Sequence, residues 1–191
     1  MSSAQELQEQ GVKQFQQKEF EEAARLFQEA GEAYEAAGQK DIAAEMQVNL
    51  ALTRRSMGAN QEAIDLMSQA LSTFTELNDQ KRRAMVLGNM GGVYVALNDK
   101  EQAAECYREA ADIFQELGEK KLHGETLLAI ANLQMSNRKV GDAAATYEAG
   151  LSELDNLSVS QKMIKGLIGF KNSLTGGGKP AIESESDDEN G

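Results

Sequence analysis

The sequence repeats itself every 40 residues, and this recurrence limits the possible folds more than any other feature of the chain. A small residue returns at one column of the repeat, and a bulky residue returns four positions later. The small residues are Ala23, Ala63, Ala103 and Ala143, and the bulky ones are Phe27, Met67, Tyr107 and Tyr147. Small residues let two antiparallel helices approach closely, and the bulky residue fills the space beside them. Because one such hairpin cannot bury its own apolar face, the recurrence predicts a stack of helical hairpins.

The stretch 82–121 contains the clearest copy of the repeat. Its marker residues are Leu87, Met90, Gly91 and Tyr94, followed by Ala103, Tyr107 and Ala110. This pattern resembles the tetratricopeptide (TPR) signature, with Leu in the place of Trp. The resemblance implies an all-α fold, a right-handed α-solenoid of four TPR helix hairpins plus a C-terminal capping helix. The chain has no Trp, and the Pro that often ends a TPR is missing.

The 40-residue period is longer than the usual TPR period of about 34 residues. In this respect the chain is similar to kinesin light chain and to spindle-orientation and scaffold adaptors. We expect the additional residues to lengthen the second helix of each repeat or its exit loop. Gly38, Asn78 and Gly118 stand where the second helices should end, and both residue types suit a left-handed C-cap.

The recurrence predicts a TPR domain over residues 1–174. Its repeats are expected at about 4–41, 42–81, 82–121 and 122–161. A helix over 161–174 would then place Met163, Leu167, Phe170 and Leu174 on one stripe. Because Leu167 and Phe170 continue columns of the repeat, this stripe favours a cap over the last hairpin. A membrane-surface or partner-docking helix is the alternative.

Residues 175–191 have a different composition, with three glycines, the only proline and a run of acidic residues. Such a segment cannot bury enough apolar surface to order itself, so we predict a disordered acidic tail. Ser184 and Ser186 each have an acidic residue three positions later, a pattern that acidophilic kinases favour. A plain solubilising tail is the simpler interpretation.

Composition argues against several classes of function. The formal net charge of −12 repels phosphate backbones and anionic lipid, so we expect no nucleic-acid and no membrane partner. Cys106 is the only cysteine and His123 the only histidine, and no motif pairs either with a catalytic partner. The N-terminus has neither the basic nor the apolar region of a signal peptide, which favours a cytoplasmic protein. We therefore expect no enzyme activity, no cofactor and no metal.

A protein- or peptide-binding groove is the function class that the residues favour. In a TPR stack the first helix of each repeat lines the concave face, and residues 84–97 carry no charge at all. Core packing does not explain Met85 and Val95, which the family register places on that open face. The same face should carry Val48, Leu52, Leu128 and Met135, with Arg54 and Arg55 at its border. Contiguous apolar surface of this kind usually marks a binding site.

Asn49 and Asn89 are 40 residues apart. The resemblance implies that an Asn at this column holds the main chain of a bound peptide, because a primary amide both donates and accepts hydrogen bonds. The fourth repeat has Ala129 instead, with Asn132 nearly one turn later. Gly88 and Gly92 either let a ligand backbone approach or allow closer helix packing.

These observations predict an adaptor or scaffold that binds a protein or peptide in its groove. The alternative is a self-assembling structural subunit, as a homo-oligomer or within a larger complex. The acidic tail could also fold back onto Arg54, Arg55, Arg82 and Arg83. The sequence does not identify the partner.

Overall fold

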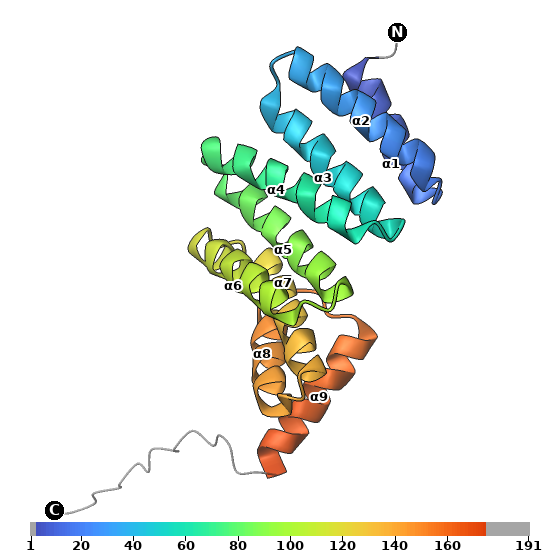
Figure 1. The fold of residues 1–191 in the computed structure, drawn as a ribbon. Helices are drawn as coiled ribbons and strands as arrows, with labels where there is room; N and C mark the ends of the chain where they lie inside the picture. Colours follow the sequence, from blue (N-terminus) through green and yellow to red (C-terminus); the bar gives the residue numbers. More distant parts are fainter. Residues whose placement is uncertain (1–2, 175–191) are drawn as a thin grey trace, which may run out of the picture. The chain divides into compact units, whose positions relative to one another are not determined.

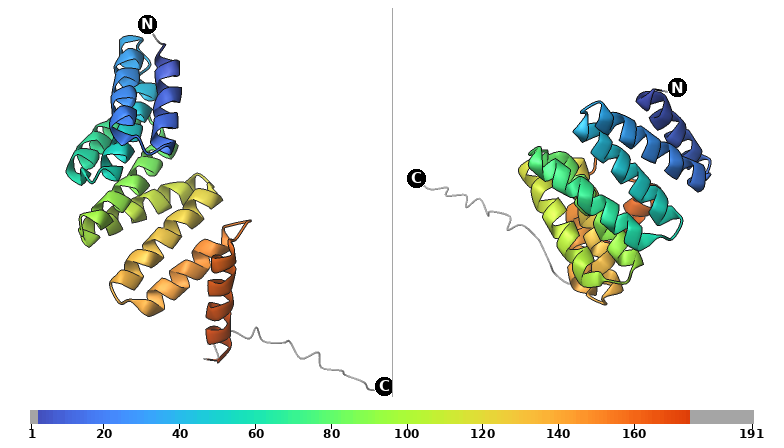
Figure 2. Two further views of the ribbon diagram at one scale, coloured as in Figure 1. Left: turned by 90° about the vertical axis from the view of Figure 1, so that its right-hand side faces the viewer. Right: turned by 45° about the horizontal axis from the view of Figure 1, so that its top comes forward.

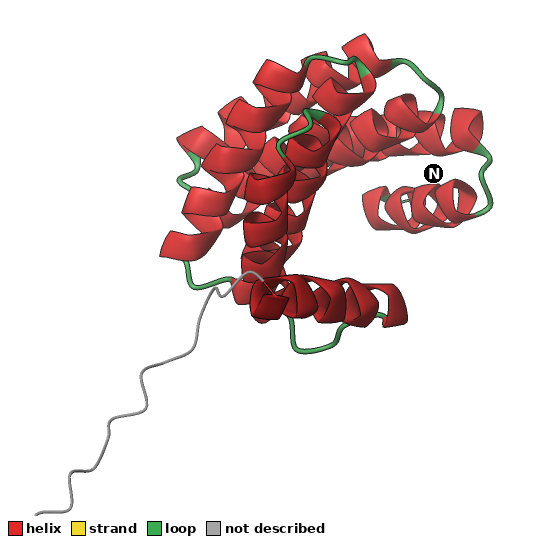
Figure 3. Cartoon of the chain, turned by 90° about the horizontal axis from the view of Figure 1, so that it is seen from below, coloured by secondary structure: helices red, strands yellow, loops and turns green. Residues whose placement is uncertain are grey.

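The computed structural model describes residues 3–174, and side chains up to residue 169. The chain divides into two compact units, residues 1–154 and 155–191, and each is described by itself. Every regular element in the described part is an α-helix, as Figure 3 shows. The tail predicted for residues 175–191, with Ser184 and Ser186, lies outside the described residues.

The first unit contains eight of the described helices (Figure 1). In chain order they are α1 (Ala4–Gln16), α2 (Phe20–Ala36), α3 (Lys40–Ser56), α4 (Asn60–Glu76), α5 (Gln80–Ala96), α6 (Lys100–Glu116), α7 (Lys120–Ser136) and α8 (Val140–Ser152). Consecutive helices pack side by side in antiparallel hairpins, which the further views in Figure 2 also show. The all-α solenoid of stacked hairpins predicted from the sequence is therefore confirmed.

The 40-residue period comes from two equal halves. Each helix from α2 to α7 has 17 residues, and three residues separate it from the next helix. The expectation that the additional residues lengthen only the second helix or its exit loop was wrong. In the second and third repeats, both helices have 17 residues and both loops have three.

The same backbone turn ends seven successive helices. Residues at 20-residue intervals adopt positive φ: Lys18, Gly38, Gly58, Asn78, Asn98, Gly118 and Arg138. The next residue donates its backbone N–H to a carbonyl five positions earlier, as Gln39 does to Tyr34 and Asp79 to Phe74. This is the Schellman pattern, which satisfies carbonyls at a helix end. The predicted caps at Gly38, Asn78 and Gly118 are confirmed.

Glycine allows the closest hairpins. A Cβ atom on Gly91 would lie 2.7 Å from the ring of Tyr107, and one on Gly11 would lie 2.9 Å from the ring of Phe27. In the second repeat the facing pair is Ala51 and Met67, both fully buried. Each ring therefore packs against a backbone that has no side chain in the way.

The second unit contains the described helix α9 (Val159–Leu174). Ser158 and Gln161 cap its start reciprocally, each side-chain oxygen accepting the backbone N–H of the other. Val159, Met163 and Leu167 are exposed on it. The capping role of this helix concerns the relation between the two units and stays a prediction.

Neither a candidate membrane span nor a candidate metal site is found among the described residues. None of their helices combines the length and apolar character needed to span a bilayer. Within the same residues, no three His, Cys, Asp or Glu side chains are grouped as a metal site would require.

Candidate functional site

Three cavities lie in a row along the first helices of the hairpins, and together we call them the front groove. The first, of about 300 Å³, lies between α1 and α3 and is lined by Val12, Phe15, Gln16, Phe27, Asn49 and Leu52. The second, also about 300 Å³, lies between α3 and α5 and is lined by Glu45, Val48, Asn49, Phe74, Arg82, Met85, Val86 and Asn89. The third, about 340 Å³, lies between α5 and α7, and Met85, Gly88, Asn89 and Gly92 form its α5 side. Successive first helices thus form one continuous hollowed face.

The two asparagines stand where the cavities meet. Asn49 lines the first and second cavities, and Asn89 lines the second and third. Neither side-chain amide makes a hydrogen bond with another described residue; in addition to its helix hydrogen bonds, the Asn49 backbone carbonyl accepts one from the Thr53 hydroxyl. Both amides therefore keep their donors and acceptors for a bound main chain.

Two of the four α5 residues that line the third cavity are glycines, Gly88 and Gly92. A Cβ atom on Gly88 would meet nothing within 4 Å, whereas the atoms nearest to one on Gly92 belong to the Arg55 guanidinium, the first at 3.0 Å. Gly88 therefore leaves space open, whereas Gly92 makes room for Arg55. Of the two alternatives for these glycines, open space fits Gly88 and close packing fits Gly92.

Arg55 is the uncompensated cation of the front groove. Its side chain is exposed and forms no ion pair with any described residue. It lies near Tyr107, which shares the third cavity. Burial raises the pKa of the Tyr107 hydroxyl, and the positive charge of Arg55 opposes that rise. The carboxylate of Glu125 also lines this cavity but does not pair with Arg55.

The predicted site residues separate into two groups. Six line the front groove: Val48, Asn49, Leu52, Arg55, Met85 and Asn89. Val95, Asn132 and Met135 are exposed but line none of these three cavities. Leu128 is half-buried and packs toward Gly150. A Cβ atom added to Gly150 would lie 3.0 Å from Leu128 Cδ2. The structure thus brings together the residues of the second and third repeats more than those of the fourth.

Arg54 does not border the front groove as expected. It lies on the opposite side of α3, where its Nε is 2.9 Å from Glu62 Oε1 in an ion pair that is not aligned as a hydrogen bond. Adjacent residues are about 100° apart on a helix, and here Arg54 lines the cavity between α2 and α4 whereas Arg55 lines the third cavity of the front groove.

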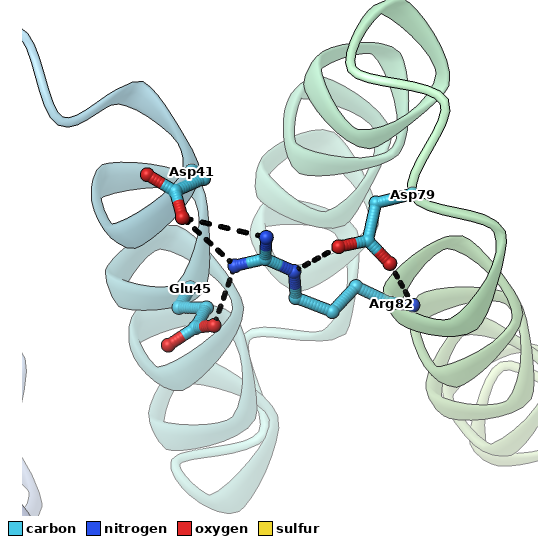
Figure 4. Close-up of polar contacts among 4 residues, drawn as sticks. All are labelled: Asp41, Glu45, Asp79 and Arg82. Carbon is cyan, nitrogen blue, oxygen red and sulfur yellow. Dashed lines mark hydrogen bonds and ion pairs between the residues drawn. The ribbon is translucent and has the colours of Figure 1, made fainter.

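The sequence did not predict a charged cluster of Asp41, Glu45, Asp79 and Arg82 (Figure 4), of which Glu45 and Arg82 line the second cavity. Arg82 Nε donates to Asp79 at 2.6 Å, and its Nη1 reaches Glu45 at 2.7 Å and Asp41 at 3.3 Å. Three carboxylates thus surround one guanidinium, which also lies over the Phe74 ring. The repeat register contained a signal for acidic residues on this face: the column of Met85 holds Glu45 and Glu125 in the neighbouring repeats.

Within this cluster Asp79 accepts hydrogen bonds from both the backbone N–H and the guanidinium of Arg82. Burial by itself would raise the pKa of the Asp79 carboxyl, but the backbone N–H and the guanidinium of Arg82 outweigh it and lower this pKa below its usual value. Burial by itself would lower the pKa of the Arg82 guanidinium, but the side-chain hydrogen bonds to Asp79 and Glu45 outweigh it and raise this pKa. Arg83 is also paired, with Glu109. Of the four arginines that the acidic tail was expected to contact, Arg54, Arg82 and Arg83 already have carboxylate partners. Arg55 is the one of the four without an ion pair among the described residues.

Comparisons with known proteins fit this architecture. The family model described as soluble NSF attachment protein, SNAP, matches residues 1–168. The crystal structure of BtubC (BKLC) from P. vanneervenii is similar at a TM-score of 0.72 and 16% identity, covering 95% of this chain and 84% of that chain. The apo form of RapI is similar at a TM-score of 0.76 and 15% identity; the match covers 91% of this chain and 50% of RapI. Identities this low show the fold alone. No curated protein sequence matches the chain significantly.

Proposed function

The chain belongs to the soluble NSF attachment protein (SNAP) family, and we propose that it is a non-enzymatic adaptor that holds a segment of a partner protein in the front groove. TPR-like repeat proteins of this kind generally bind other proteins. The family is described by attachment to another protein, NSF, which supports a protein-binding role here. A cytoplasmic location, expected from the sequence, belongs to the same proposal.

One observation carries the proposal: two unbonded amides stand between three consecutive cavities. An extended segment that crosses α3 and α5 would pass Asn49 and then Asn89, and each amide can bind a peptide group without reading its side chain. Met85, 45% exposed between the second and third cavities, would contact the apolar side chains of the segment. Its flexible thioether adapts to several shapes.

Gly88 offers a sharp test because it can be filled without disturbing the fold. The same column carries Leu128 in the next repeat, and a Cβ atom on Gly88 meets nothing within 4 Å. Gly88→Leu should therefore keep or raise the melting temperature while it obstructs the groove. Gly141→Gln is the matched control, since Gly141 is also open and the same column carries Gln61.

The measurement is affinity capture with immobilised wild type and variants, with thermal melts of each. We expect Gly88→Leu, Met85→Asp and Asn89→Ala to lose captured proteins that Gly141→Gln retains. Asn89→Ala should weaken capture by about tenfold or less, since one hydrogen-bonding group is removed. If all three groove variants capture the same proteins as wild type, the groove is not the binding site.

Self-association is the second candidate. It is supported by the exposed Val159, Met163 and Leu167 on α9, which could be buried by another copy or by another subunit of a complex. Sedimentation velocity at micromolar concentration distinguishes the candidates. A strict monomer excludes the homo-oligomer, whereas a dimer that Met163→Asp disperses supports it.

A further inference from the structure

A second and larger cavity lies on the other side of α3, between α2 and α4. It measures about 700 Å³, and we call it the back cleft. Met46, Leu50 and Arg54 of α3 line it, whereas Val48 and Leu52 line the front groove. Successive members of this alternating series are two residues apart, or about 200° around the helix. The back cleft therefore uses a different side of α3 from the front groove, and the two share only the buried Phe27 of α2 among their lining residues.

The back cleft is open because two of its residues are small. Gly31 lines it from α2 and Ala43 from α3. In the next repeat the same columns carry Leu71, which packs against the core, and Arg83, which pairs with Glu109 on α6. The chain thus fills this position with large side chains at one junction and leaves it empty at the other.

The chemistry of the back cleft is apolar inside and acidic at the rim. Ala43, Met46, Leu50 and Leu66 supply apolar walls. Glu32, Glu35 and Glu62 stand around them, and Arg54 is the only cation among the lining residues. Since Arg54 is already paired with Glu62, two carboxylates have no cation within the cleft.

We propose that the back cleft binds a basic amphipathic helix of a partner protein. A cleft bordered by two helices suits the helix-in-groove mode of recognition, in which one apolar stripe enters the groove. Glu32 and Glu35 are one helical turn apart on α2, so lysines or arginines one turn apart on the partner helix would match them. Large apolar side chains between these cations on the partner helix would fill the back cleft beside Gly31 and Ala43. In the next repeat, Leu71 and Arg83 fill the corresponding space with the chain's own side chains.

The probes are two synthetic helical peptides of equal length, one built from Leu and Lys and the other from Leu and Glu. Each carries a fluorescent label, and binding to the full chain is followed by anisotropy. We expect the Leu–Lys peptide to bind and the Leu–Glu peptide not to bind. Equal binding of both peptides, or of neither, overturns the proposal.

Variants locate the bound peptide. Gly31→Leu, which copies Leu71, should weaken Leu–Lys binding by about tenfold or more, and so should Glu32→Gln with Glu35→Gln. The matched controls should change it by about twofold or less: Gly88→Leu fills the front groove, and Glu101→Gln with Glu105→Gln removes two exposed charges from α6. Circular dichroism and thermal melts establish that every variant is folded.

Each other outcome contradicts the proposal in a recognisable way. If Gly31→Leu binds the peptide as wild type does, the cleft is not its site. If the α6 control weakens binding as much as the Glu32 and Glu35 variant, the attraction is general and not specific to the cleft. If wild type self-associates in sedimentation and Gly31→Leu is monomeric, the occupant is a second copy of this chain. Loss of front-groove capture would leave these results unchanged, so the two proposals fail separately.

Discussion

The first junction, where α3 packs between α2 and α4, is open, whereas the second junction, where α5 packs between α4 and α6, is filled. Both have the same helix lengths and the same register. They differ in the residues that face the neighbouring hairpin: Gly31 and Ala43 at the first, Leu71 and Arg83 at the second. The columns inside a hairpin hold the fold, and the columns between hairpins can therefore vary and provide binding surfaces.

Emptying the second junction should have the largest effect. Leu71→Gly removes a side chain that packs against the main core cluster and also lowers helix propensity. We expect the free energy of unfolding to fall by about 2–3 kcal/mol, as measured by urea denaturation. Ser72→Gly, at an exposed neighbouring position, measures the propensity cost of introducing glycine without loss of a packed side chain, about 0.5 kcal/mol. Equal losses in both variants would show that Leu71 does not fill the junction.

Removing the charge of Arg82 should weaken the second junction less. Arg82→Met keeps an apolar stem but leaves the carboxylates of Asp41, Glu45 and Asp79 without their cation. Since these groups are 26–44% exposed, solvent screens them. We expect a loss of about 1 kcal/mol at low salt and less at high salt. Arg108→Met is the control, because no ion pair is found for Arg108 among the described residues.

The same variant has a predicted pH dependence. The folded-state pKa of Asp79 is lowered, so its contribution to stability is present above the ordinary aspartate pKa of about 3.9 and is lost as pH falls through the folded-state value. Wild type should therefore lose its advantage over Arg82→Met in acid. An advantage that stays constant from neutral pH down to pH about 2 would contradict this account.

Much of the fold could be predicted from the sequence because the recurrence is carried by core residues. The column from Ala23 to Ala143 and the bulky column beside it set the hairpins directly. Glycine and asparagine also indicated the caps at residues 38, 78 and 118. Lys18 and Arg138 adopt the same positive φ, but their residue types do not favour this conformation and therefore did not indicate a cap. At these two positions the repeat imposes the turn on an unfavourable residue.

Helix periodicity predicts which residues face the groove, so that part of the candidate site was predictable. It does not predict where small side chains leave a cavity open. Asn49 and Asn89 fall at the expected column and line the groove. Arg54 was expected at the border of the front groove, but it lines the cleft between α2 and α4, where it pairs with Glu62. The back cleft was missed because Gly31 and Ala43 look like ordinary helix residues in isolation. Only a comparison with Leu71 and Arg83 in register reveals the missing volume.

Filling the first junction should raise stability slightly. Gly31→Leu replaces a helix-interior glycine, and a Cβ atom there would meet Met46 at an ordinary 3.4 Å. The expected gain is about 0.5–1 kcal/mol, most of it from helix propensity. Gly88→Leu, also in a helix interior and with nothing within 4 Å of its Cβ position, should show the same propensity gain without contact with the back cleft. A destabilised Gly31→Leu would mean that the first junction is too narrow for the leucine that the second one holds.

The turns that lead into the two junctions should differ least. Gly38 precedes the first junction with φ 74°, and Asn78 precedes the second with φ 55°. Both types tolerate the left-handed region, asparagine less readily, so Asn78→Gly should gain and Gly38→Asn should lose a few tenths of a kcal/mol. Gly38→Ala should cost about 1 kcal/mol, because a Cβ atom is strained at this φ even though nothing lies within 4 Å of it. If exchanging these two residues altered stability as much as Leu71→Gly does, the contrast between the junctions would originate in the backbone turns and not in the side chains packed behind them.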